Sequence, residues 1–207
     1  MKRVGGKMNK LKEILLSKDI EKSINDNIDY ILDMIPEIKF SINFPHNHPH
    51  HHLDVWKHTM LAMSMSPAQF DIRISLLLHD IGKPFSYQDK DVRHFHNHPK
   101  VSAQMSSVIL ERNNVENKDY IMKIIELHDT AITMQNINEN PDFCRDLFIV
   151  QYCDALAHNP EKLTNRIKYI KGVLEYFDKY QKSNNRTIDF PENIKAVYED
   201  KSFQNEF

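Results

Sequence analysis

The stretch Leu76-Leu77-Leu78-His79-Asp80-Ile81-Gly82-Lys83-Pro84 decides how this chain is organised. An apolar run leads into an imidazole and a carboxylate that stand side by side, and Gly82 and Pro84 then break the segment. The pattern predicts a buried helix with His79 and Asp80 at its end. Burying an unpaired carboxylate is costly, and a cation is one way to compensate. The stretch therefore predicts a pair of metal ligands presented by a buried helix.

The composition favours one globular domain and excludes several functions. The chain has 207 residues, 41% hydrophobic and 27% charged, with a net charge of −2 and no long basic block. Non-specific nucleic-acid binding, which depends on many Lys and Arg contacts, is not favoured. Neither a transmembrane run nor a secretory signal is visible. Cys144 and Cys153 fall in one expected helix, roughly 13 Å apart along its axis and beyond disulfide reach. We therefore expect a cytoplasmic protein.

Hydrophobic residues recur at helical spacing along most of the chain and predict an all-α helical bundle. Residues 41–52, SINFPHNHPHHH, hold two prolines without periodicity and predict a loop. Asp54 suits the start of the next helix, and His98-Pro99 begins another. Residues 82–93 and 129–141 are expected to be irregular, and no strand pattern is visible. The expected helices cover residues 9–34, 53–66, 68–79, 98–113, 118–128, 142–157 and 160–180.

The expected organisation is a helical extension over residues 1–40, the main domain over 41–182 and a tail over 183–207. The twelve histidines are concentrated in the main domain: seven lie between His46 and His79, and His94, His96 and His98 follow. Such clustering indicates either a metal site or a polar loop rich in histidine.

Two further side chains stand on apolar helical faces, as His79 and Asp80 do. His58 lies mid-helix in DVWKHTM, where a core histidine bonded to a neighbour is the ordinary interpretation. Asp154 lies in FIVQYCDALAH, where a buried hydrogen bond or ion pair is the ordinary interpretation. Three separate helices thus each bring a ligand-capable group out of an apolar face, and one shared metal explains all of them.

The order His58, His79-Asp80, Asp154, set in DVWKHTM, LLLHDIGKP and QYCDALAH, resembles the HD-domain superfamily of metal-dependent phosphohydrolases. The resemblance covers about residues 45–160. The HDIGKP motif, with DVWKHT before it, is similar in sequence to the HD modules attached to some bacterial tRNA nucleotidyltransferases. Here the HD module is expected to stand alone. The resemblance implies a helical bundle in which these four residues bind a divalent metal.

His98 in FHNHPKVS and His128 in IIELHDT lie between the HD pair and the last aspartate. The resemblance implies that they hold a second ion, with Asp80 bridging the two. Without the resemblance, the ordinary interpretation of His98 is a loop residue that caps a helix. That of His128 is a cation at a helix C-terminus. Histidine and carboxylate ligands fit Fe, Mn, Zn, Co or Ni, and two ions suit phosphoester hydrolysis.

Several residues are candidates for substrate contacts. Lys83 follows the HD turn and is a candidate phosphate ligand, with Arg73 a weaker one. His52, six residues before His58, is a candidate proton donor or phosphate contact. The neighbouring histidines of the 41–52 loop are expected to be solvated, namely His46, His48, His50 and His51.

The remaining candidates border the expected pocket. His94 and His96 are expected on its rim or in the loop, and Asp129 is a candidate for orienting a ligand imidazole. Phe85, Tyr87 and Phe95 are candidates for stacking on a base, whereas core packing is expected for Trp56.

The sequence predicts an HD-domain phosphohydrolase with Asp80, Lys83 and His52 in catalytic roles. It is expected to cleave a phosphoester or phosphoanhydride bond of a small phosphorylated substrate, with a nucleotide favoured. One alternative is a phosphodiesterase acting on cyclic nucleotides or RNA ends. Another is a non-catalytic module that binds metal or nucleotide, against which the complete ligand set argues.

Overall fold

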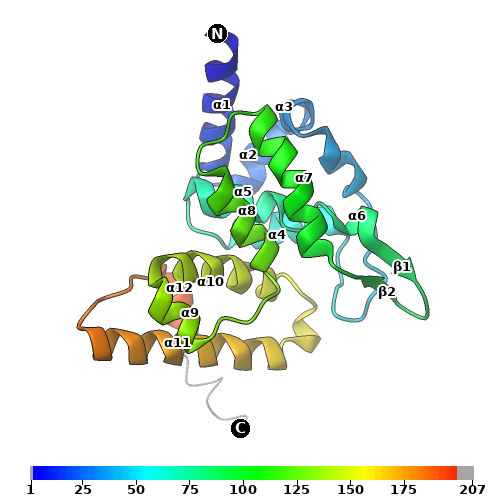
Figure 1. Cartoon of the computed structure of the whole chain (residues 1–207). Coiled ribbons are helices and arrows are strands. Elements are labelled where there is room, and N and C mark those ends of the chain that lie inside the picture. The colour runs from blue at the N-terminus through cyan, green and yellow to red at the C-terminus, as the bar shows by residue number, and fades with distance from the viewer. Residues whose placement is uncertain (1, 200–207) are drawn as a thin grey trace.

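The computed structural model describes residues 2–199, and nearly all of its regular structure is helical, which confirms the all-α prediction (Figure 1). Two short 3₁₀ helices, η1 (Pro36–Phe40) and η2 (Pro160–Lys162), lie between longer elements. The α-helices are, in chain order, α1 (Lys2–Leu15), α2 (Ile20–Asp26), α3 (Ile28–Met34), α4 (Val55–Ser64), α5 (Phe70–Leu78), α6 (Lys83–Ser86), α7 (His98–Arg112), α8 (Lys118–Leu127), α9 (Met134–Glu139), α10 (Pro141–Leu156), α11 (Thr164–Asn184) and α12 (Glu192–Glu199).

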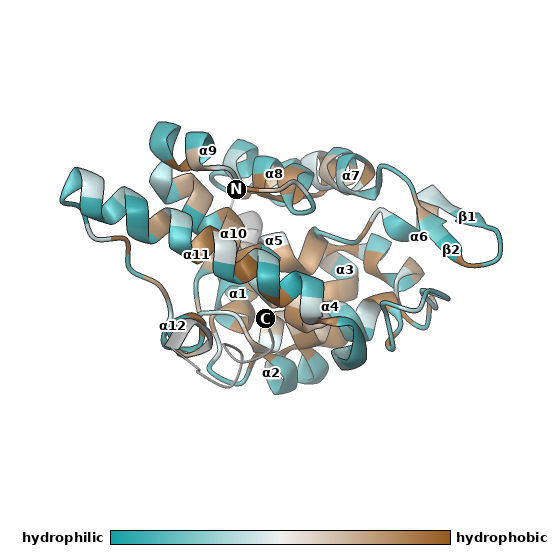
Figure 2. Ribbon diagram, turned by 90° about the horizontal axis from the view of Figure 1, so that it is seen from below, coloured by the Kyte–Doolittle hydropathy of each residue, from teal (hydrophilic) through white to brown (hydrophobic). Residues whose placement is uncertain are grey.

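Helices α5 and α10 form the centre of the molecule. Every residue from Ile72 to Leu78 is buried, and most of α10 is buried as well. The two helices pack on each other and on α4 and α8, while α11 covers α9 and α10. Figure 2 shows the hydrophobic segments gathered in the interior and hydrophilic residues on the outer faces.

One hydrophobic core extends through the described chain, from Met8 in α1 to Ile194 in α12. Residues of the expected N-terminal extension therefore share a core with the central helices. The domain boundaries at residues 40 and 182 stay a prediction. Within residues 2–199, none of the helices combines the length and apolar character that a membrane crossing requires.

Local capping signals explain where the helices that carry the site begin. The Asp54 carboxylate accepts a hydrogen bond from the Lys57 amide at 2.9 Å and caps α4. Asn97 adopts a left-handed conformation with φ of 57° immediately before α7, and Pro occupies the first turn. The predicted helix starts near residues 53 and 98 are confirmed.

Two regions expected to be irregular contain short elements. Strands β1 (Tyr87–Asp89) and β2 (Arg93–Phe95) form an antiparallel hairpin that begins within the predicted 82–93 loop and extends two residues beyond it. Strands of three residues are too short to show alternation. In the 129–141 segment, Thr133 and Asn136 form a capping box that begins α9. The prediction of no regular structure in these segments was wrong.

Gly82 fixes the distance between the end of α5 and helix α7. Its amide donates a hydrogen bond to Ser102 Oγ at 2.9 Å. A Cβ atom at this position would lie 2.6 Å from the backbone nitrogen of Ser102, so only glycine fits without movement of the backbone. This close approach brings the start of α7, and with it His98, beside Asp80.

Candidate metal centre

The six predicted ligand residues converge at one point in the interior, and all are at least nine-tenths buried. They come from α4, α7, α10 and the C-terminal ends of α5 and α8. Their potential ligand atoms form two groups, and within each group these atoms lie within 4.8 Å of one another. The first group contains His58, His79, Asp80 and Asp154, and the second contains Asp80, His98 and His128.

The first group surrounds Oδ2 of Asp80 and Oδ1 of Asp154. His58 Nε2 lies 2.8 Å from Asp154 Oδ1 and 3.6 Å from Asp80 Oδ2. His79 Nε2 lies 3.3 Å from Asp80 Oδ2 and 3.5 Å from Asp154 Oδ1. Both imidazoles therefore aim the same ring nitrogen at the same pair of carboxylate oxygens.

The second group faces the other oxygen of Asp80. His98 Nε2 lies 3.3 Å from Asp80 Oδ1 and 3.2 Å from His128 Nε2. His128 Nε2 lies 3.9 Å from Asp80 Oδ1. Because its two oxygens face different groups, the Asp80 carboxylate is oriented to bridge them.

Backbone carbonyls fix the orientation of the four imidazoles. A carbonyl only accepts hydrogen bonds, so the facing Nδ1 carries the proton and Nε2 presents its lone pair inward. This tautomer follows from the hydrogen-bond network. The pairs are His58 Nδ1 with Ala157 O (3.1 Å), His79 Nδ1 with Leu76 O (2.7 Å), His98 Nδ1 with Phe95 O (3.0 Å) and His128 Nδ1 with Ile125 O (2.6 Å).

This arrangement fits divalent cations. With Nε2 as an acceptor, the His98 to His128 contact joins two acceptors, which requires a cation or a proton between them. Within residues 2–199, His79 Nε2 and both oxygens of Asp80 are buried without a hydrogen-bond partner, and only the ion pair of Oδ2 with Lys83 compensates part of this. Buried polar atoms are normally paired, so their convergence indicates a missing charge. The imidazole and carboxylate donors suit Fe, Mn, Zn, Co or Ni.

Protons take part of that role in the metal-free chain. Burial opposes the charge on His79, but the carboxylates of Asp80 and Asp154 outweigh it and raise its pKa to about 9. Burial also opposes the charge on Asp80, yet His79 and Lys83 hold its pKa well below the usual range. The centre therefore keeps its carboxylates ionised.

Lys83, the candidate phosphate ligand after the HD turn, reaches the centre. Its Nζ lies 2.7 Å from Asp80 Oδ2, an ion pair, and 3.2 Å from His46 Nε2. His46 is buried and bonds through Nδ1 to the Leu53 carbonyl at 2.8 Å, so its predicted place in a solvated loop was wrong. Burial lowers the pKa of His46 to about 2, which leaves a neutral acceptor for Lys83.

Two predicted candidates do not reach the centre. His52 is exposed, and its neighbour His51 faces inward instead, stacked on His46 with ring centroids 3.7 Å apart. Arg73 is buried and donates to the carbonyls of Leu15 at 2.6 Å and Ser17 at 2.7 Å, so it ties the end of α1 to α5.

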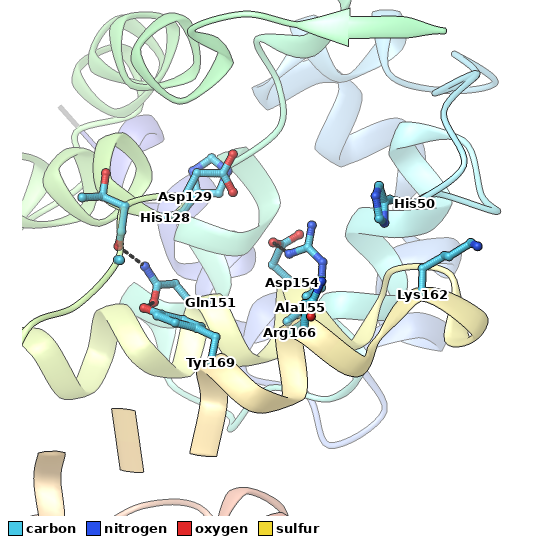
Figure 3. Close-up of a pocket in the computed structure, with 12 residues that line it drawn as sticks. His50, His128, Asp129, Gln151, Asp154, Ala155, Lys162, Arg166 and Tyr169 are labelled. Atoms are coloured by element: carbon cyan, nitrogen blue, oxygen red, sulfur yellow. Dashed lines mark hydrogen bonds and ion pairs between the residues drawn. The ribbon is translucent and has the colours of Figure 1, made fainter. Parts of the chain in front are cut away.

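Two cavities open beside the metal centre. The smaller, about 180 Å³, is lined by Asp80 and Lys83 together with His48, His51, His94 and Phe95. The larger, about 350 Å³, is bounded by Gln151 and Ala155 of α10 and by Asn165, Arg166 and Tyr169 of α11 (Figure 3). The two cavities share His128, Asp129, Asp154 and Arg166 in their walls.

The remaining predicted residues occupy different places around the centre. Asp129 Oδ2 lies 3.4 Å from His98 Nε2, on the side of the ring that faces the second group, while the Phe95 carbonyl orients that ring from behind. Phe85 and Tyr87 are exposed on the surface. Trp56 is partly buried and packs against the core, as expected, and His96 is exposed.

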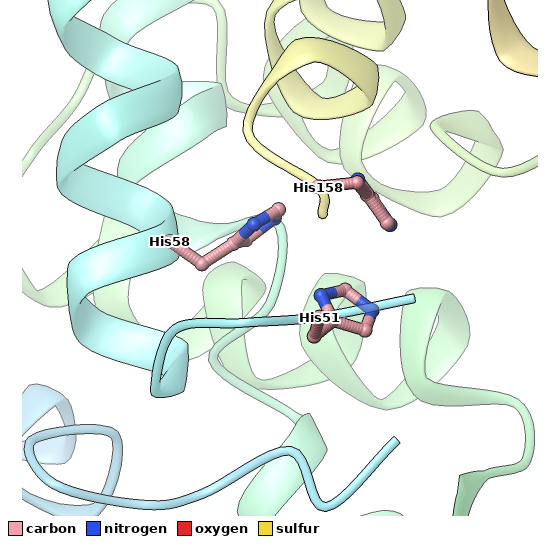
Figure 4. Close-up of side chains that lie close together, drawn as sticks. All are labelled: His51, His58 and His158. Atoms are coloured by element: carbon pink, nitrogen blue, oxygen red, sulfur yellow. The ribbon is translucent and has the colours of Figure 1, made fainter. Parts of the chain in front are cut away.

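A third set of close side chains, His51, His58 and His158, supports the first group (Figure 4). His158 Nδ1 donates to the Asp154 carbonyl at 2.8 Å, and its Nε2 accepts from Arg166 at 2.7 Å. The nitrogens of His58 are engaged by Ala157 and Asp154. Both nitrogens of His158 have partners and Nε2 of His58 already faces the first group, so among these rings only His51 Nδ1 is buried without a partner. We therefore assign the set to the surroundings of the centre.

Sequence reasoning missed His158 and Arg166. His158 stands four residues after Asp154, a spacing that can place both on one helical face. No motif marks Arg166.

A buried centre of this composition, set between two cavities in a helical bundle, defines a metal-binding enzyme site. Residues 50–164, more than half of the sequence, match the HD domain family. The chain therefore belongs to this family. It is an HD-domain metal-dependent phosphohydrolase. All six ligand-capable residues lie within the matched region, whereas Arg166 lies beyond it.

Proposed function

We propose that the chain hydrolyses a phosphoester or phosphoanhydride bond of a nucleotide. The observation that carries this proposal is the pair of unequal cavities sharing Asp154 and His128 in their walls. The smaller, at about 180 Å³, suits a phosphoryl group. The larger, at about 350 Å³, is lined by Ala131, Ala155 and Tyr169 together with charged side chains such as Lys162, and its size suits a nucleoside.

We propose two divalent ions, with Asp80 shared between them. His58, His79 and Asp154 complete the first site, and His98 and His128 contribute to the second. Bound there, the ions supply Lewis-acid polarisation of a phosphoryl oxygen and a water of lowered pKa. The donor set is compatible with Fe, Mn, Zn, Co or Ni.

The residues of the chain have distinct roles in this proposal. The backbone carbonyls hold the imidazoles in one tautomer, so the lone pairs stay directed at the centre. Lys83 keeps Asp80 ionised and places an ammonium group in the wall of the smaller cavity, where it steadies a phosphoryl oxygen. The exposed His52 has no part in this proposal, and His51 takes the position at the cavity wall.

The test is phosphate release from a panel of nucleoside mono-, di- and triphosphates, cyclic nucleotides and RNA ends. RNA ends belong in the panel because we propose that the HDIGKP string, with DVWKHT before it, relates the chain to the HD modules of bacterial tRNA nucleotidyltransferases. We expect turnover of a nucleotide, and loss of that turnover in Asp80→Ala with the helical circular dichroism signal retained. Full activity of that variant would refute the proposal.

The panel also separates the alternatives. Turnover restricted to cyclic nucleotides or RNA ends would indicate a phosphodiesterase. Thermal stabilisation by a nucleotide without turnover under any of the metals would indicate a binding module. We also propose a cytoplasmic location, which is consistent with Cys144 and Cys153 being free and buried.

A further inference from the structure

Three lysine and arginine side chains line the smaller cavity among the described residues, and two of them already have charged partners. Lys83 forms an ion pair with Asp80 at 2.7 Å. Arg93 donates to both oxygens of Asp89, at 2.7 and 3.2 Å, and to the Pro45 carbonyl. Each of these two cations is therefore already paired with a carboxylate of the protein, which weakens but does not remove its attraction for a phosphoryl oxygen.

Arg166 differs because its closest partner is neutral. Its Nη2 donates to His158 Nε2 at 2.7 Å, and His158 in turn donates from Nδ1 to the Asp154 carbonyl at 2.8 Å. His158 is 3% exposed, so the acceptor is held rigidly in the interior. The nearest described carboxylate oxygen, Asp154 Oδ2, lies 4.0 Å from Nη1. The guanidinium thus retains charge and donors for an incoming anion.

The guanidinium also lies where a substrate would be divided between the cavities. Arg166 belongs to the wall of both cavities, and its side chain is 34% exposed. Figure 3 shows it beside the carboxylate of Asp154. An anion bound here contacts the metal centre on one side and the larger cavity on the other.

We propose that Arg166 binds the phosphoryl group of the substrate at the junction of the two cavities, and that His158 positions the guanidinium. The inference rests on the proposed function, since it assigns the scissile phosphoryl group to this junction. It places the leaving group in the larger cavity. Arginine suits this role because its planar donors match phosphate oxygens.

The test is the affinity for inorganic phosphate of the full Mn²⁺-loaded chain, measured by isothermal titration calorimetry. We expect Arg166→Gln to weaken phosphate binding by about 10- to 100-fold, the range for losing a charged hydrogen-bond donor. Arg186→Gln is the matched control. It removes a guanidinium that pairs with Asp142 and lines neither cavity, so phosphate affinity should stay within about twofold of the parent.

A pair of variants tests the positioning role of His158. His158→Phe removes the acceptor for Arg166, and we expect about tenfold weaker phosphate binding. His158→Gln keeps an acceptor oxygen and a donor, so it should restore most of the affinity. Metal content per chain should equal that of the parent in the Arg166 variant.

Unchanged phosphate affinity in Arg166→Gln, or no phosphate binding by the parent, would overturn the inference. Loss of metal from Arg166→Gln would also overturn it, because the residue would then hold the centre together. The substrate panel reports on the proposed function separately. Arginine-dependent phosphate binding without nucleotide turnover would refute the proposed function and leave the inference standing. Nucleotide turnover together with phosphate binding that does not depend on Arg166 would refute the inference and leave the proposed function standing.

Discussion

Asp80 is the residue on which both halves of the metal centre depend. Its Oδ2 faces His58 and His79, and its Oδ1 faces His98 and His128. We predict that Asp80→Asn, which keeps the size of the side chain and removes its charge, loses both ions. Elemental analysis of metal per chain, on protein purified without a tag or chelator, measures this.

His98→Ala is the informative comparison for that variant. His98 belongs only to the second group, so we predict about two ions in the parent and about one in this variant. One ion in both proteins would restrict the centre to the first group. Two ions retained in Asp80→Asn would contradict the bridging role of the carboxylate.

The proton on His79 makes metal binding depend on pH. In the metal-free chain, burial lowers the pKa of His79, but Asp80 and Asp154 outweigh burial and raise it to about 9. The imidazole is therefore protonated at neutral pH and must lose that proton to bind a metal. We predict that the apparent metal affinity rises with pH up to about pH 9. Calorimetry at pH 7.5 in buffers of different ionisation enthalpy should detect proton release.

The same shift predicts the opposite trend for the stability of the metal-free chain. A folded-state pKa raised above the unfolded value of about 6.5 stabilises the fold below pH 6.5. That contribution is lost as the pH rises through the folded-state value of about 9. The melting temperature of the metal-free chain should fall across this window. Metal binding without proton release at pH 7.5 would contradict both trends.

At the scale of elements, the contact between Gly82 and α7 holds the second group in place. An added Cβ would lie 2.6 Å from the backbone nitrogen of Ser102, so α7 must move and carry His98 with it. We predict that Gly82→Ala lowers the free energy of unfolding by about 1–3 kcal/mol and weakens binding of the second ion. Urea unfolding and metal analysis measure the two effects.

Gly172→Ala provides the matched control for that substitution. Gly172 lies within α11, and no atom lies within 4 Å of where its Cβ would stand. Alanine there should stabilise the chain by about 0.4–1 kcal/mol, because it reduces the freedom of the unfolded chain and favours the helix. If both variants kept the second ion and gained stability, the close approach at Gly82 would not control the position of α7.

The elements that sequence predicted best are those whose signal is local and repeated. The helices carry periodic apolar faces over many residues, and proline and capping residues mark their starts. The β1–β2 hairpin and α9 were not predicted, because segments of three to six residues are too short to show a hydrophobic periodicity. The position of the hairpin follows from contacts such as the guanidinium of Arg93 on the Pro45 carbonyl, which exist only in the folded chain.

The same distinction separates the residues of the site. His79 and Asp80 could be predicted as ligands because they directly follow an apolar run in the sequence. His46 gave no such signal, because it lies among other histidines of the 41–52 loop in the sequence. It is buried because Lys83 and the Leu53 carbonyl contact it in the fold. The role of Arg166 could not be predicted from the sequence, because it depends on how α11 places the residue beside His158 in the fold.

At the scale of the whole molecule, the metal centre joins segments that are far apart in the chain. His58 and Asp154 are separated by 96 residues, and the six ligand-capable residues come from helices throughout the core. Among the described residues, the oxygens of Asp80 and the inward nitrogen of His79 are buried without hydrogen-bond partners, apart from the ion pair of Oδ2 with Lys83. A cation bound there satisfies these atoms in the folded state alone, so binding must stabilise the fold.

We therefore predict that removal of the metals lowers the melting temperature markedly. An ion present at a hundred times its dissociation constant stabilises the fold by about 2.7 kcal/mol. For a chain of this size, each kcal/mol shifts the melting temperature by about 2–4 °C. Loss of one such ion should therefore lower it by about 5–10 °C. Differential scanning calorimetry with and without a chelator measures the shift, and Asp80→Asn, which lacks the ions, should not respond to the chelator. An equal melting temperature before and after verified metal loss would show that the centre contributes nothing to the stability of the fold.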